Sequence, residues 1–147
     1  MAEGTNKNPL AQFEDTLDEY FGKKAPALPQ NIREFIVKIA PYSAIIFLIF
    51  TLFGFIGYYV LGQSLGGFTT IGNFHMLLLV PVVILEAMAV PGLFSRKAMA
   101  WRYMFWALII SSASNLVQLN IVGGIISTLI SALIGFYILF QIKSFYK

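Results

Sequence analysis

Glu86 is the only acidic residue within the long apolar stretches of this 147-residue chain, and it has the clearest chemical potential. It lies between Pro81 and Pro91, in a segment that is otherwise almost entirely apolar. A carboxylate costs about 2.5 kcal/mol or more at the centre of a bilayer on insertion scales, so its side chain is expected to face protein or water. The flanking prolines leave backbone carbonyls free to help coordinate a cation. Glu86 is therefore a candidate proton- or cation-handling site.

A structural role is the alternative for Glu86. Its carboxyl group could be protonated and hydrogen-bonded, or it could pair with a long basic side chain of the nearby group Arg96, Lys97 and Arg102. His75 cannot assist directly, because a spacing of eleven residues separates the two by about 16 Å along a continuous helix. As the single histidine of the chain, His75 has no ligand partner for a metal and is expected at the outer membrane surface.

A polar stripe marks the third apolar stretch. Ser111, Asn115 and Gln118 are spaced at i, i+4 and i+7, which places them on one face of a helix, with Ser114 beside them. Such a stripe could line a water-filled path. The alternative is that these side chains hydrogen-bond to neighbouring helices, at roughly 0.6 kcal/mol per interaction in membrane proteins.

Small side chains recur every four residues along the last apolar stretch. They are Gly123, Ser127, Ser131 and Gly135, and a second row beside them holds Gly124, Thr128 and Ala132. This pattern lets two helix backbones approach each other closely. It predicts tight helix packing against the third stretch of the same chain, a second copy or a foreign subunit.

The chain lacks the constellations that catalysis or cofactor binding needs. It contains no cysteine, which excludes disulfides, thiolate metal sites and cysteine nucleophiles. It contains no phosphate-binding loop, nucleophile elbow, HExxH pair or dinucleotide fingerprint. We therefore expect no catalytic residues, no metal and no cofactor, and a protein that is not an enzyme. Nucleic-acid binding is not expected either, because the net charge of +3 is spread over three separate segments.

Composition predicts an integral membrane protein. Apolar residues make up 58% of the chain and charged residues only 12%, against about a quarter charged in a soluble domain. Four apolar stretches each approach the roughly 20 residues that a helix needs to cross the hydrocarbon core, at 41–61, 74–94, 99–119 and 121–140. The expected fold class is all-α, with residues 31–147 forming a membrane four-helix bundle preceded by an interfacial helix that bends at Pro41.

The positions of the basic residues predict the orientation in the membrane. All ten Lys and Arg residues lie before the first stretch, around the connection between the second and third, or in the tail. The other two connections carry no charge. Basic residues stay on the cytoplasmic side during insertion. We therefore expect a multi-pass protein with both termini in the cytoplasm.

Residues 1–30 predict a cytoplasmic amphipathic helix and a proline-rich linker. Asn8 and Pro9 suit the start of the helix, and Gly22 suits its end. The polar face is acidic, with Glu14, Asp15, Asp18 and Glu19. Carboxylates disfavour adsorption to anionic lipid, which leaves two alternatives. The helix could fold back over the cytoplasmic end of the bundle, or it could dock on another protein.

The acidic head, the run LPQNIREF at 28–35 and the LFQIKSFYK end at 139–147 resemble those of small uncharacterised bacterial four-span integral membrane proteins. This resemblance covers most of the chain in character. It implies a bacterial plasma membrane and no particular activity. Small multidrug exporters also have four short spans and one membrane glutamate, but theirs lies in the first span, whereas Glu86 lies in the second.

These patterns together predict a non-enzymatic accessory or scaffold subunit of a larger membrane assembly. The expected partners are the lipid bilayer and a protein, either foreign or a second copy, that contacts the last span. The alternative function is a homo-oligomeric transporter or channel in which Glu86 handles protons or cations.

Overall fold

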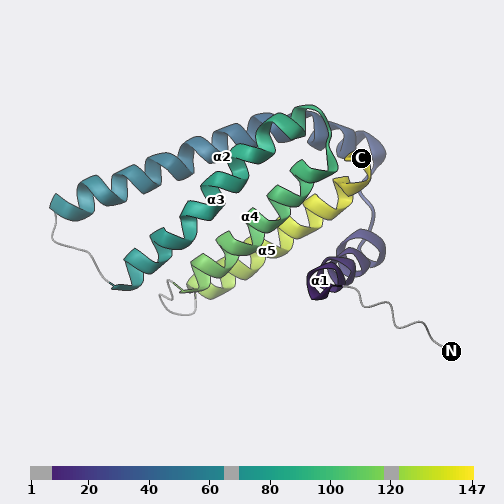
Figure 1. Ribbon diagram of the computed structural model, residues 1–147. Helices are drawn as coiled ribbons and strands as arrows, with labels where there is room; N and C mark the ends of the chain where they lie inside the picture. Colours follow the sequence, from purple (N-terminus) through teal and green to yellow (C-terminus); the bar gives the residue numbers. More distant parts are fainter. Residues whose placement is uncertain (1–7, 65–69, 118–122) are drawn as a thin grey trace.

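The computed structural model is helical throughout and describes residues 8–64, 70–117 and 123–147 (Figure 1). Four long helices form the body: α2 (Gln30–Ser64), α3 (Thr70–Phe94), α4 (Ala98–Val117) and α5 (Gly123–Ile142). A short N-terminal helix, α1 (Pro9–Leu17), continues into a π-helical segment, η1 (Asp18–Lys24), and a 3-10 turn, η2 (Lys143–Phe145), follows α5. The described residues contain no strand, so the predicted all-α class is confirmed.

Three segments of these helices are long and apolar enough to cross a membrane, judged by length and composition. They are Gln30–Gly62, Phe74–Phe94 and Ile125–Phe145. The stretch predicted at 99–119 is helical up to Val117, but α4 is not among the three. Its polar residues, Arg102 and the group of Ser and Asn in its second half, lower its hydropathy. In Figure 1, α4 lies between α3 and α5, where neighbouring helices shield it.

The start of α2 differs from the prediction. Pro41 was expected to separate an interfacial helix from the first span, yet α2 runs without interruption from Gln30 to Ser64 with Pro41 inside it. Side chains beyond this point, such as Phe47, Phe50 and Phe53, point away from the bundle and are exposed. In contrast, α1 begins as predicted, with Pro9 in its first turn and the Asn8 side chain accepting a hydrogen bond from the Leu10 amide at 3.2 Å.

The apolar core is concentrated where the first turns of α4 pack against the last turns of α5. The indole of Trp101 stacks on Phe105, with ring centroids 5.4 Å apart, and Phe140 meets both rings edge-on. The helices also approach closely at two glycines. A Cβ atom at Gly92 would lie 2.7 Å from the Ala100 Cβ, and one at Gly135 would lie 3.0 Å from the Leu108 side chain. A larger residue at Gly92 would therefore clash with Ala100, whereas one at Gly135 would require the end of the Leu108 side chain to shift by a few tenths of an ångström.

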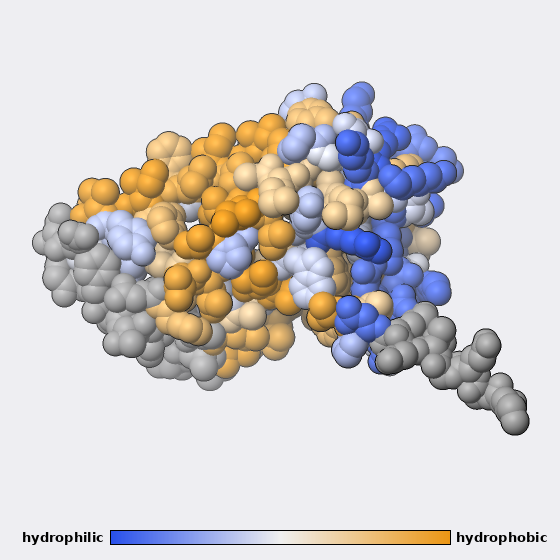
Figure 2. Space-filling model, in the orientation of Figure 1, coloured by the Kyte–Doolittle hydropathy of each residue, from blue (hydrophilic) through white to orange (hydrophobic). Residues whose placement is uncertain are grey.

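Charged residues gather at one end of the molecule. Apart from Glu86, those of the described part belong to α1, η1, the first turns of α2, the α3–α4 turn with the start of α4, and the tail. Figure 1 places these segments at the same end, and Figure 2 shows hydrophilic residues there and hydrophobic residues over the rest of the visible body. We call this region the charged end.

The α3–α4 turn and the tail hold each other at the charged end. Arg96 adopts a left-handed conformation with φ of 53°. The amide of Lys97 donates to the Gly92 carbonyl at 2.9 Å, which closes the end of α3. The backbone of Lys147 then pairs with this turn, donating to the Arg96 carbonyl and accepting from the Ala98 amide.

Candidate functional site: a polar groove between α4 and α5

A groove of about 350 Å³ opens between the halves of α4 and α5 that lie away from the charged end. It is lined by Leu108, Ser111, Ser112 and Asn115 of α4 and by Ser127, Thr128, Ser131 and Ala132 of α5. Six of these eight side chains carry a hydroxyl or an amide. A concentration of polar groups on a surface that is otherwise apolar makes this groove the candidate site.

The groove joins two features that the sequence analysis treated separately. Ser111 and Asn115 come from the predicted polar stripe, whereas Ser127 and Ser131 come from the predicted small-residue face. Gly135 continues that face toward the charged end and contacts Leu108 of α4. The small-residue face is therefore turned toward α4 of the same chain. The third stripe residue, Gln118, lies outside the described residues, and Gly123 is placed as the first residue of α5.

Most polar side chains of the groove make no hydrogen bond with the part of the chain that the structure describes. Among the described residues, no hydrogen bond is made by the side chains of Ser111, Ser112, Asn115, Thr128 and Ser131. Asn115 and Ser131 are exposed. A hydroxyl or amide in hydrocarbon without a hydrogen bond costs several kcal/mol on alkane scales, so the groove needs water or a polar partner.

His75 and Ser114 form a separate buried pair between α3 and α4. The side chain of His75 is 6% exposed and that of Ser114 is 0% exposed. The Ser114 Oγ atom lies 2.8 Å from His75 Nδ1 and 3.3 Å from the His75 carbonyl oxygen, and His75 Nδ1 also lies 3.1 Å from the Ser114 carbonyl oxygen. His75 is therefore not the surface residue that the sequence predicted. A serine and a histidine in contact can act as nucleophile and base, but here complete burial leaves no access for a substrate.

Glu86 faces α2, where the Thr51 hydroxyl lies near its carboxyl group. The Thr51 hydroxyl donates to the Phe47 carbonyl at 2.9 Å, so its proton is already used within α2. The second carboxyl oxygen, Oε2, is buried and has no hydrogen-bond partner among the described residues. Within that same part of the chain, no ion pair joins Glu86 to Arg96, Lys97 or Arg102.

Few side chains that could bind a metal ion lie around Glu86 in the described residues. In residues 8–64, 70–117 and 123–147, no three His, Cys, Asp or Glu side chains lie close enough to hold a metal ion. Ca²⁺ takes six to eight oxygen ligands, and one carboxyl group with one hydroxyl falls far short of that number. Glu86 therefore stays a predicted proton- or cation-handling site, and a cation there would need backbone carbonyls or water as further ligands.

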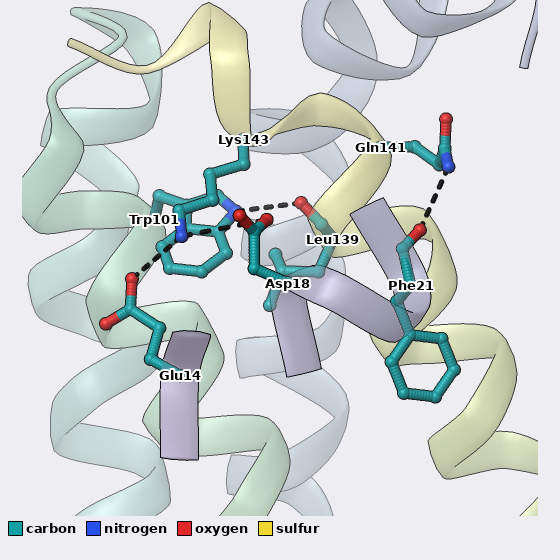
Figure 3. A network of polar contacts seen from close by, with 7 residues as sticks. All are labelled: Glu14, Asp18, Phe21, Trp101, Leu139, Gln141 and Lys143. Carbon is teal, nitrogen blue, oxygen red and sulfur yellow. Dashed lines mark hydrogen bonds and ion pairs between the residues drawn. The ribbon is translucent and has the colours of Figure 1, made fainter. Parts of the chain in front are cut away.

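At the charged end, by contrast, the N-terminal head (α1 and η1) folds back onto α5 (Figure 3). The Lys143 ammonium lies 3.0 Å from a Glu14 carboxylate oxygen and 3.8 Å from one of Asp18. It also lies over the Trp101 ring, 4.9 Å from the centroid. The amide of Gln141 donates to the Phe21 carbonyl at 3.0 Å. Of the two alternatives for the head, the structure shows folding back.

The remaining head charges form an exposed pair. Lys24 Nζ lies 2.8 Å from Glu19 Oε1. The hydrogen bond and attraction from Lys24 lower the pKa of the Glu19 carboxyl group, and Lys23 adds a smaller Coulombic effect. Glu19 raises the pKa of Lys24 in return. On the tail, burial raises the pKa of the Tyr146 phenol, and the charge of Arg96 offsets part of this effect.

No family model, curated protein or solved structure matches this chain. The resemblance to small bacterial four-span membrane proteins therefore stays a prediction. The function has to be argued from the groove, Glu86 and the charged end.

Proposed function

We propose that this chain is a non-enzymatic integral membrane protein that serves as an accessory or scaffold subunit of a larger assembly. In this proposal α2 to α5 are four spans, and the α4–α5 groove binds a transmembrane helix of a foreign partner. The observation that carries it is a set of five groove side chains that make no hydrogen bond among the described residues: Ser111, Ser112, Asn115, Thr128 and Ser131.

The orientation follows from the charged end. Its basic residues, among them Lys38, Lys97 and Lys143, gather where α1, the α3–α4 turn and the tail meet. Cytoplasmic segments are enriched in Lys and Arg, which favours this end on the cytoplasmic side, in a bacterial plasma membrane. As a span, α4 would tolerate its lower hydropathy because α3 and α5 flank it (Figure 1).

A helix is the occupant that fits the groove best. Ser127 and Ser131 are four residues apart, so they repeat along α5 with the period of an adjacent helix. The occupant needs small residues, which let its backbone approach α5, and polar side chains that pair with hydroxyl and amide groups. The outer half of α2 from a second copy fits less well, because it presents the bulky apolar Phe50 and Phe53 beside Gly54.

The test is a gentle purification of the tagged chain from its own membranes at native expression level, followed by intact-mass analysis. We expect a stoichiometric foreign subunit. Ser131→Trp, which fills the groove, should abolish its recovery, whereas Ile130→Trp should not, because Ile130 is exposed outside the groove. The chain has no cysteine, so Ser131→Cys supplies a single thiol for cross-linking to the same subunit. A monodisperse monomer without a companion would overturn the proposal.

A homo-oligomer alone would instead favour the second candidate, a proton- or cation-conducting transporter or channel. The observation behind this candidate is the buried Glu86 Oε2 atom, which has no hydrogen-bond partner in the described part of the chain. Glu86→Gln should then abolish flux into liposomes while the protein still folds. Glu34→Gln is the matched control, because Glu34 is exposed and pairs with Gln30 at the charged end. Unchanged flux in Glu86→Gln would remove this candidate.

A further inference from the structure

A second groove, of about 570 Å³, lies between the head and α5. Its walls include Tyr20, Phe21 and Pro26 on the head side and Leu133, Ile134 and Tyr137 on α5. Almost all of this lining is apolar, so the groove suits a hydrocarbon group rather than a polar molecule. The Tyr137 hydroxyl donates to the Pro26 carbonyl at 2.6 Å and fixes the linker against α5.

The groove lies where the apolar body meets the charged end. Leu133 and Ile134 are each 54% exposed and belong to the outward-facing surface of α5. The other wall of the groove belongs to the head, which is part of the charged end. In a bilayer, this boundary corresponds to the level at which acyl chains join their headgroups. The apolar lining is therefore continuous with a surface that contacts lipid.

The head is less repulsive to anionic lipid than its sequence indicates. Glu14 and Asp18 face Lys143, and Glu19 pairs with Lys24. The Lys24 ammonium also lies 4.6 Å from the ring centroid of Tyr20, which lines the groove, so this cation stands at the groove's edge. Lys23, the next residue, is exposed and has no ion pair within the described residues. At the end of η1, Glu19, Lys23 and Lys24 together carry one net positive charge, whereas the whole head, with Asp15 and with Lys143 counted in, carries one net negative charge.

We propose that this groove holds an acyl chain of an anionic phospholipid whose headgroup phosphate contacts Lys23 and Lys24. The apolar lining accounts for the chain, and the net positive charge at the end of η1 accounts for a preference over zwitterionic lipid. The inference rests on the membrane location given under Proposed function, but not on the α4–α5 groove or on a protein partner.

The experiment is native mass spectrometry of the full chain in detergent with phosphatidylglycerol or phosphatidylcholine of identical acyl chains. The wild type should retain phosphatidylglycerol preferentially, by about fivefold for each lysine that contributes. The double variant Lys23→Gln/Lys24→Gln should lose this preference and still bind both lipids. Leu133→Trp, which fills the groove, should lose both. Leu129→Trp is the control, because Leu129 is also exposed, lies one turn away and does not line the groove.

Three results would overturn the proposal: equal retention of the two lipids by the wild type, an unchanged preference in the double variant, or wild-type binding by Leu133→Trp. Ile134→Trp, at the neighbouring exposed position, replaces Leu133→Trp if the latter fails to fold. Fractionation of cell membranes separates this inference from the one on which it rests. A chain absent from the membrane fraction defeats both, whereas a membrane-bound chain without lipid preference defeats only the lipid site.

Discussion

Two regions of this molecule differ in how many of their polar side chains make hydrogen bonds or ion pairs within the chain. At the charged end, Lys143 contacts two carboxylates, and Gln141 both donates to Phe21 and accepts from the Leu28 amide. In the α4–α5 groove, the side chains of Ser111 and Ser131 make no hydrogen bond within the described part of the chain. Polar groups in an apolar medium are stable only when they are paired. Lys143 and Gln141 therefore find their partners within the chain, although the buried Arg33 Nε and Tyr146 hydroxyl of the charged end have none among the described residues. In the function that we propose, the polar groups of the groove are paired by a helix of another protein.

The largest expected effect of a substitution is at the charged end. Trp101 is 3% exposed, stacks on Phe105 and donates its indole N–H to the Leu139 carbonyl at 2.8 Å. Trp101→Ala should lower the free energy of unfolding by about 3–5 kcal/mol, because it leaves a cavity in the core. Thermal unfolding in detergent, followed by circular dichroism, measures this loss. Phe50→Ala, at a 70% exposed position, should change little, and equal losses would contradict a core at this end.

Two serines of α4 sharpen the comparison between paired and unpaired polar groups. Ser114 is buried against His75, whereas Ser112 lines the groove without a hydrogen bond among the described residues. Ser114→Ala should cost about 1–3 kcal/mol of unfolding free energy, because it removes the two hydrogen bonds that this buried hydroxyl makes with His75 Nδ1 and with the His75 carbonyl. Ser112→Ala should stay within about 0.5 kcal/mol of the wild type in the purified chain. The same unfolding measurement tests both, and a larger loss from Ser112→Ala would show that the groove is structural.

A smaller effect is expected from the ion pairs of the head. Lys143→Gln should cost about 1 kcal/mol, because its ammonium is only partly exposed and contacts both carboxylates and the Trp101 ring. Amide hydrogen exchange in α1 and η1 should then speed up. Lys24→Gln breaks only an exposed pair and should leave exchange nearly unchanged. If the two variants exchange alike, Lys143 does not hold the head.

The smallest expected effect is at the α3–α4 turn, and it is stabilising. Arg96 has φ of 53°, which is strained for any residue with a Cβ atom. Arg96→Gly relieves that strain, and after the entropy of glycine in the unfolded chain about 0.5 kcal/mol of net stabilisation should remain. Thermal unfolding provides the measurement. Lys97→Gly is the control, because it adds chain entropy at a position without positive φ.

The sequence predicted the positions of the helices better than the side-chain contacts between them. Helical starts, apolar length and the grouping of basic residues follow local rules, which is why α1 begins at Pro9 and the charged end forms as predicted. Pairing across helices depends on rotation about each helix axis, which a single sequence does not contain. This is why His75 was placed at the surface, and why the polar stripe and the small-residue face were not predicted to share one groove.

The unbroken course of α2 has a similar origin. Proline disfavours helix interiors by a local rule, but packing around Pro41, which is buried, overrides that preference. For Glu86, the sequence indicated an unusual environment, whereas its neighbour Thr51 lies on a different helix and could not be identified from the chain alone.

The contacts of the head with α5 impose an order on biosynthesis. Gln141 and Phe21 bond across 120 residues of chain, and Gln141 and Leu28 across 113. The ribosome makes α1 and η1 first, so the head emerges long before Lys143 exists to receive Glu14. Until α5 has been made, the head has no helix of its own chain on which to dock. Docking of the head therefore marks the moment at which every helix of the body is present.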